Sequence, residues 1–153
     1  MILNDEQRRE VSELLEGNLE QSVKIVYFTQ QKPSIELPVE VGVSPCEYCE
    51  ETEELLKEIS DLSDKLAIEI YDYIKDKDKV EQYEISDVPA TILLGDKDYG
   101  IRYYGIPSGY EFSALLETMI NVSKRQSKLT DSTKEVLASI EKPVHMKVFV
   151  TPT

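Results

Sequence analysis

Cys46 and Cys49 are the only cysteines in the chain, and they stand three residues apart in the sequence Cys46-Glu47-Tyr48-Cys49. In a reducing compartment, a pair with this spacing is more often redox-active or metal-binding than structural. The motif therefore indicates thiol–disulfide exchange, half of a zinc site, or an inert structural pair.

A zinc site within one chain is not expected, because zinc takes about four protein ligands in a structural site. Besides the two cysteines the chain offers one histidine, His145, which we interpret as a residue on the face of a strand rather than a catalytic group. Two classes of function remain. One is a thiol–disulfide oxidoreductase, and the other is a non-catalytic binding module with a structural or vestigial disulfide.

The residues after the motif repeat at helical spacing, which predicts a helix led by Cys46. At a helix N-terminus the unsatisfied N–H groups and the positive end of the helix dipole stabilise a thiolate. Cys46 is therefore predicted to be the nucleophile, and Cys49, on the apolar face, to resolve the mixed disulfide. Carboxylates follow closely at Glu50 and Glu51, and they oppose a thiolate.

The elements around the motif predict an α/β fold. The predicted order is strand, cysteine-led helix, strand, helix, hairpin and helix. In this order the strands form one sheet, and helices cover both of its faces. The expected helices cover residues 5–17, 46–66, 76–83, 109–122 and 133–140, and the expected strands cover residues 23–29, 66–73, 91–94 and 100–104. Residues 37–44 alternate in polarity, which predicts a half-buried strand with an edge position or an irregular entry. This strand is either a hairpin partner of residues 23–29 or the strand that delivers the cysteines.

Several segments together resemble the N-terminal half of the two-unit, glutaredoxin-like protein disulfide oxidoreductases of archaea and bacteria. They are CEYC, EISDLSDKLAIEIYD, ISDVPATILLGDKDYGIRYYGIPSGYEF and MKVFVTPT, in matching order. The resemblance implies a thioredoxin-like fold with a central mixed sheet. It also implies a cysteine-bearing unit over residues 1–128 and, over residues 129–153, the helix-strand start of a truncated second unit. Relative to this family, residues 30–44 look like an insertion.

The same resemblance assigns roles to two further residues. Pro89 would follow a cis peptide bond and lie against the disulfide, and Val88 would offer its backbone to an extended substrate. Tyr48, inside the motif, either supports local packing or contacts substrate. Glu40 stands six residues before Cys46, where thioredoxins carry a buried proton acceptor, but an exposed Glu on an alternating strand is the favoured interpretation.

Charge and composition restrict the partners. The net charge of −13 repels phosphate backbones and anionic lipids, so neither nucleic acid nor a membrane is expected as a partner. No apolar run approaches the ~20 residues of a membrane helix, and the N-terminus lacks a signal-peptide pattern. We expect a cytoplasmic protein that uses no cofactor beyond its own disulfide. Its expected partners are protein disulfides or dithiols and an upstream reductase.

The C-terminal region is predicted to hold one short helix and a strand from His145 to Thr151. A strand that carries Val148 and Phe149 would expose apolar side chains and open edges unless it paired with a partner. Three outcomes are open: docking onto the first unit, pairing with the same strand of another molecule, or disorder with aggregation. The favoured one is a stable partner, most simply a second copy of the chain in a symmetric homodimer.

Overall fold

A computed structural model describes residues 2–30 and 46–149 of the chain. Most of the predicted insertion, including Glu40, lies outside these residues. The helices and strands, in chain order, are α1 (Asp5–Asn18), β1 (Val23–Thr29), α2 (Cys49–Ser60), β2 (Leu66–Asp72), α3 (Lys77–Gln82), β3 (Ala90–Leu94), β4 (Asp98–Tyr104), α4 (Tyr110–Lys124) and α5 (Asp131–Ala138).

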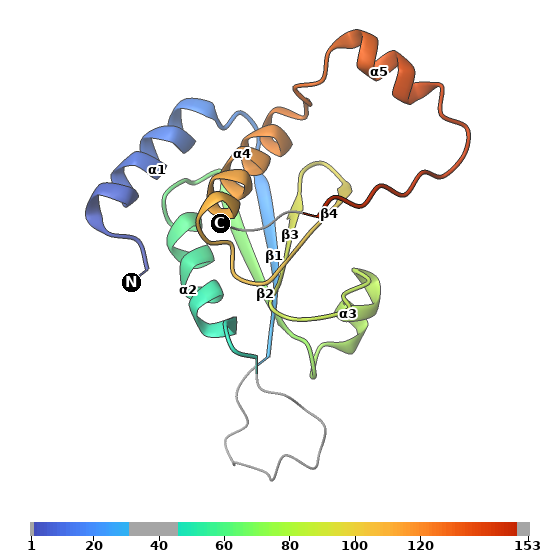
Figure 1. Ribbon diagram of the computed structural model, residues 1–153. Coiled ribbons are helices and arrows are strands. Elements are labelled where there is room, and N and C mark those ends of the chain that lie inside the picture. The colour runs from blue at the N-terminus through green and yellow to red at the C-terminus, as the bar shows by residue number, and fades with distance from the viewer. Residues whose placement is uncertain (1, 31–45, 150–153) are drawn as a thin grey trace.

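The four strands form one mixed sheet in the order β2-β1-β3-β4. β1 runs parallel to β2 and antiparallel to β3, and β4 returns antiparallel to β3 as the second strand of a hairpin. β1 is rich in β-branched and aromatic residues, which suit a strand with neighbours on both sides. The predicted mixed sheet is confirmed, and its central strand leads directly toward the cysteine motif (Figure 1).

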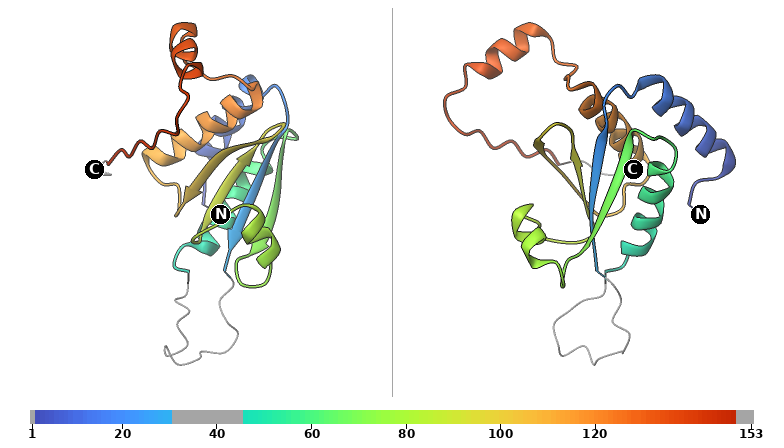
Figure 2. Two further views of the ribbon diagram at one scale, coloured as in Figure 1. Left: turned by 90° about the vertical axis from the view of Figure 1, so that its right-hand side faces the viewer. Right: turned by 180° about the vertical axis from the view of Figure 1, so that it is seen from behind.

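Helices cover both faces of the sheet, as predicted. α1, α2 and α4 lie on one face, and α3 lies on the other (Figures 1 and 2). The side chains of β1 alternate between these layers: Tyr27 belongs to the larger apolar cluster beneath α2 and α4, whereas Phe28 belongs to the smaller one beneath α3. Both are fully buried, so the position of β1 is fixed from both sides.

The helix that carries the motif begins later and ends earlier than predicted, because it finishes at Ser60 and not at residue 66. α2 starts at Cys49, with Tyr48 as its N-cap, so Cys46 lies ahead of the helix and does not lead it. The backbone of Tyr48 has φ −117° and ψ 16°, which is not helical. The buried apolar face of the helix also begins at Cys49 and continues through Leu55, Leu56 and Ile59. The packing of this face therefore does not favour a helix that starts as early as Cys46.

The region after α4 is exposed. In residues 125–149 every side chain is solvent-exposed, and α5 projects away from the sheet layers (Figure 1). Residues 143–149 form neither helix nor strand, so the strand predicted from His145 is wrong for the part of it that is described. A strand needs a neighbouring edge, and this segment aligns with no strand of the described sheet.

Among the described helices none is long and apolar enough to cross a membrane.

Candidate active site

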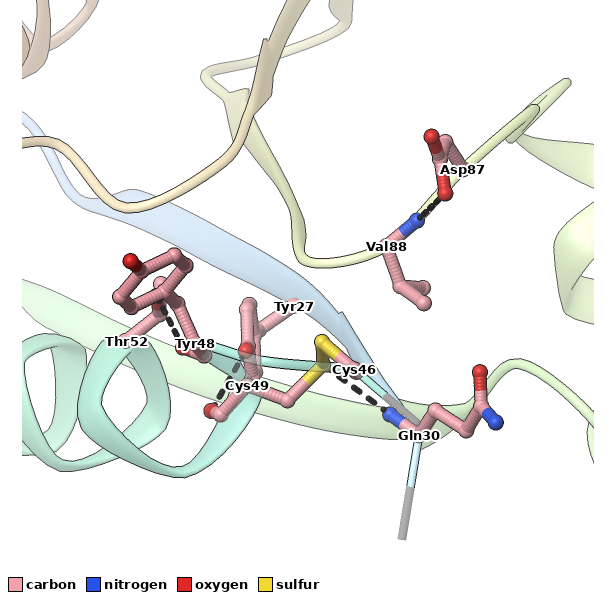
Figure 3. The surroundings of a disulfide bond; sticks show 8 residues. All are labelled: Tyr27, Gln30, Cys46, Tyr48, Cys49, Thr52, Asp87 and Val88. Carbon is pink, nitrogen blue, oxygen red and sulfur yellow. Dashed lines mark hydrogen bonds between the residues drawn. A yellow bond between two sulfur atoms is a disulfide. The ribbon is translucent and has the colours of Figure 1, made fainter. Parts of the chain in front are cut away.

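The two cysteines form a disulfide at the start of α2, at the end of the sheet where β1 finishes (Figure 3). Their surroundings differ. Cys46 is half-buried, whereas the Cys49 side chain is only 1% exposed. Of the two residues, Cys46 is therefore the more accessible to an incoming thiol or disulfide.

Two hydrogen bonds from β1 and the residue after it hold Cys49. The Tyr27 hydroxyl donates to the carbonyl oxygen of Cys49 at 2.8 Å, and the backbone N–H of Gln30 donates to its Sγ at 3.3 Å. Burial raises the pKa of Tyr27, so its hydroxyl stays protonated and acts as a donor. Sequence reasoning missed both contacts because Tyr27 has the pattern of a core aromatic. The available signal was its hydroxyl, which requires a partner when buried.

Tyr48 lies on the surface beside the disulfide. Its side chain is 46% exposed, and Figure 3 shows the ring directed away from the two sulfurs. Its carbonyl accepts hydrogen bonds from the backbone N–H and the hydroxyl of buried Thr52, at 3.0 and 2.7 Å. A hydrogen bond to Glu47 raises the pKa of the Tyr48 phenol. The backbone of Tyr48 is therefore held by α2 while its ring remains accessible.

The segment Asp87-Val88-Pro89 faces the disulfide from the other side. The Val88–Pro89 peptide bond is cis, as the family resemblance implies. Pro89 is buried, and its carbonyl accepts a hydrogen bond from the N–H of Gly105 at 2.9 Å. Gly105 has a φ of +89°, a backbone conformation that suits glycine. Figure 3 shows the Val88 side chain pointing toward the disulfide.

The N–H of Val88 is not free in this structure. It donates to the Oδ1 of the preceding Asp87 at 2.8 Å. A substrate strand that bound to this N–H would have to displace the carboxylate. Sequence reasoning did not anticipate this contact, because Asp87 is exposed and has the pattern of an ordinary turn residue.

Carboxylates dominate the electrostatics near the motif. Glu47, Glu50 and Glu51 are exposed, and the last two occupy the first turn of α2. There they interact favourably with the helix dipole. The same charges repel a thiolate on Cys46, so they favour the oxidised form of the pair.

The sequence predicts that His145 lies on the face of a strand, but residue 145 belongs to no strand in the described part of the chain. His145 is exposed in the C-terminal segment, and Tyr103 on β4 bonds Thr118 of α4 at 2.7 Å. Tyr104 and Tyr110 are exposed, the second of them 87% so. Within the ranges that the structure describes, no group of three or more His, Cys, Asp or Glu residues could hold a metal ion.

Comparison with known proteins agrees with this fold. The family model described as "Thioredoxin domain" matches residues 36–117, which include both cysteines and the cis peptide bond. A protein disulfide oxidoreductase from Aeropyrum pernix has a TM-score of 0.73 and 30% sequence identity, over 91% of this chain and 56% of that one. The expected resemblance to the protein disulfide oxidoreductases is therefore confirmed.

A second group of relatives consists of larger redox proteins. The alkyl hydroperoxide reductase AhpF of Staphylococcus aureus is 25% identical over 97% of this chain. This chain spans about a quarter of that relative's length, 24%. The structure of AhpF from Enterococcus faecalis shares the fold, with a TM-score of 0.73 at 22% identity over 93% of this chain and 62% of that one. The chain thus belongs to the thioredoxin domain family, and disulfide oxidoreductases are among its relatives.

Proposed function

We propose that the chain exchanges disulfides with protein substrates through Cys46 and Cys49. One observation carries this proposal. The disulfide is asymmetric, with Cys46 accessible and Cys49 buried, and it lies beside the cis Val88–Pro89 segment. Such asymmetry suits a pair in which one sulfur meets the substrate and the other closes the cycle.

In the reducing direction, the Cys46 thiolate attacks one sulfur of a substrate disulfide. A mixed disulfide forms, and the other substrate sulfur leaves with the bonding electron pair and takes up a proton. The Cys49 thiolate then attacks the Sγ of Cys46, which breaks the mixed disulfide and releases the second substrate thiol. The substrate gains two electrons, and the chain ends with the Cys46–Cys49 disulfide.

Substrate binding is assigned to the surface around the disulfide. In this proposal Val88 pairs through its backbone with an extended substrate segment, and Pro89 keeps that segment against the sulfurs. Tyr48 supplies an exposed aromatic contact, since its ring is accessible. No cofactor takes part beyond the Cys46–Cys49 pair, because thiol–disulfide exchange needs only the two sulfurs.

The partners are protein disulfides or dithiols and an upstream reductase that returns Cys46 and Cys49 to thiols. Similarity to the alkyl hydroperoxide reductase AhpF supports a partner in a peroxide-reducing system. We place this exchange in the cytoplasm, without nucleic acid or membrane partners.

Reduction of insulin disulfides by dithiothreitol, followed as turbidity, tests the proposal. The wild-type chain should accelerate the reaction, and Cys46→Ser should abolish the acceleration because the attacking sulfur is gone. Acceleration that survives in Cys46→Ser would contradict the proposal. If the wild-type pair were reduced and titrated as two thiols yet gave no acceleration, the chain would instead be a binding module with a structural disulfide.

A further inference from the structure

Cys49 is held at two points by the strand that precedes the motif. The Tyr27 hydroxyl bonds its carbonyl oxygen at 2.8 Å, and the Gln30 N–H bonds its sulfur at 3.3 Å. Tyr27 is fully buried, and Cys49 is 1% exposed. Figure 3 shows Tyr27 and Gln30 on either side of Cys49, with α2 leading away from it.

We infer that Tyr27 is a positioning residue for the resolving step, and that the N–H of Gln30 stabilises the Cys49 thiolate that performs it. This inference deepens the proposed function and rests on it. A buried thiol is reluctant to ionise, because a low-dielectric interior penalises the charged form. A hydrogen bond donated to the sulfur offsets part of that penalty. Here the donor is a backbone amide.

The role of Tyr27 follows from where its hydroxyl is attached. Cys49 is the first residue of α2, where a helix end is least constrained by its own hydrogen bonds. The Tyr27 bond ties this first residue to β1, the strand that also leads to Gln30. Loss of the bond would let Cys49 move relative to the Gln30 amide and to the mixed disulfide on Cys46.

The affected chemical step is the second half of the exchange. The Cys49 thiolate forms a bond to the Sγ of Cys46, the bond between Cys46 and the substrate sulfur breaks, and that sulfur leaves with the electron pair. The first half, attack by Cys46 on the substrate, involves neither Tyr27 nor Gln30. Loss of either contact should therefore slow one step and leave the other unchanged.

A stopped-flow reaction with 5,5′-dithiobis(2-nitrobenzoate) separates the two steps. Reduced protein at a concentration equal to that of the reagent should release one coloured thiolate when Cys46 attacks, at a rate that depends on concentration. A second coloured thiolate should be released when Cys49 resolves the adduct, and the rate of this step should not depend on concentration. Tyr27→Phe keeps the buried ring and removes the hydroxyl. It should slow the second phase on the order of fivefold, the effect of one lost hydrogen bond.

Tyr103→Phe is the matched control, because Tyr103 also lies on the sheet and bonds a side chain on α4 through its hydroxyl. It should change neither phase. A second pair of variants does not depend on the packing of a core ring. Gln30→Pro removes the amide hydrogen just after β1, and Gln30→Ala keeps it. Gln30→Pro should slow the resolving phase by a similar factor, whereas Gln30→Ala should leave that phase unchanged.

The outcomes separate the inference from the proposed function. An unchanged second phase in Tyr27→Phe would overturn the role of Tyr27, and equal rates in Gln30→Pro and Gln30→Ala would overturn that of the amide. Both phases slowed equally, together with a lower melting temperature, would show that Tyr27 has only a structural role. The absence of a first phase in the wild-type chain would contradict the proposed function itself.

Discussion

The packed unit that carries the disulfide and the C-terminal segment of residues 125–149 use apolar residues in opposite ways. Around the sheet the apolar side chains are buried, and Leu56 of α2 is fully so. In the C-terminal segment the same kinds of side chain face solvent, and Val136 of α5 is 65% exposed. Helical spacing predicts a helix in both places. It does not say whether the apolar face of that helix has anything to pack against.

The largest expected difference between the two regions is in stability. Leu56→Ala should lower the free energy of unfolding by about 2–5 kcal/mol, because it leaves a cavity in the core. Val136→Ala, the matched change in the exposed segment, should alter it by less than about 0.5 kcal/mol. Urea unfolding followed by circular dichroism measures both. Similar losses from the two substitutions would mean that α5 is packed in solution.

The reduction potential should also depend on the packed unit alone. Glu47, Glu50 and Glu51 oppose a thiolate on Cys46, so we expect a potential below roughly −200 mV, toward the thioredoxin and glutaredoxin end of the range. Glu51→Gln should raise the potential by roughly 10 mV, since it removes one partly screened charge. Glu141→Gln, in the exposed segment, should leave it unchanged. Equilibration with glutathione gives these values, and a wild-type potential near −120 mV would contradict this expectation.

A smaller effect is expected at Asp87, whose carboxylate accepts the hydrogen bond from the N–H of Val88. If substrate backbone binds to that N–H, Asp87→Ala should lower the KM for insulin about two- to threefold, because the competing acceptor is gone, and leave kcat unchanged. Asp131→Ala removes the same charge from α5 and should have no effect. A KM that rises in Asp87→Ala would show that the carboxylate assists binding.

Removal of residues 129–153 should have the smallest effect on catalysis, since no described side chain beyond residue 124 is buried. The rate of insulin reduction should stay within about twofold of the full chain. The predicted homodimer through residues 145–151 is tested by light scattering. The full chain should be a dimer and the shortened one a monomer. Equal masses would show that this segment does not mediate association.

Much of the fold was predictable because local patterns and packing agree within the unit. The strand and helix ranges from Val23 to Lys124 follow their periodicities within a few residues, except that α2 ends at Ser60 and not at residue 66. The proposed division into units at residues 128 and 129 stays a prediction. The strand expected from His145 failed because a strand depends on a neighbour, which its own residues do not specify.

The site was predictable in part, for a related reason. The cysteines and the Val88–Pro89 pair are marked by spacing and by resemblance to the family. Three features were not predicted: the start of α2 at Cys49, the hydrogen bond from Tyr27 to the Cys49 carbonyl, and the hydrogen bond from the Val88 N–H to Asp87. Each of these depends on how a backbone group is oriented in space, and the residue type alone does not determine that. Glu40 lies outside the described residues, so its role stays untested.

The central claim is that Cys46 attacks and Cys49 resolves, and trapping of the intermediate tests it most directly. Reduced Cys49→Ser should accumulate a mixed disulfide with a peptide disulfide substrate, which peptide mapping by mass spectrometry should locate at Cys46. Reduced Cys46→Ser should form little or no adduct, because Cys49 is buried. An adduct that accumulates on Cys49 of Cys46→Ser at a comparable rate would contradict this assignment of roles.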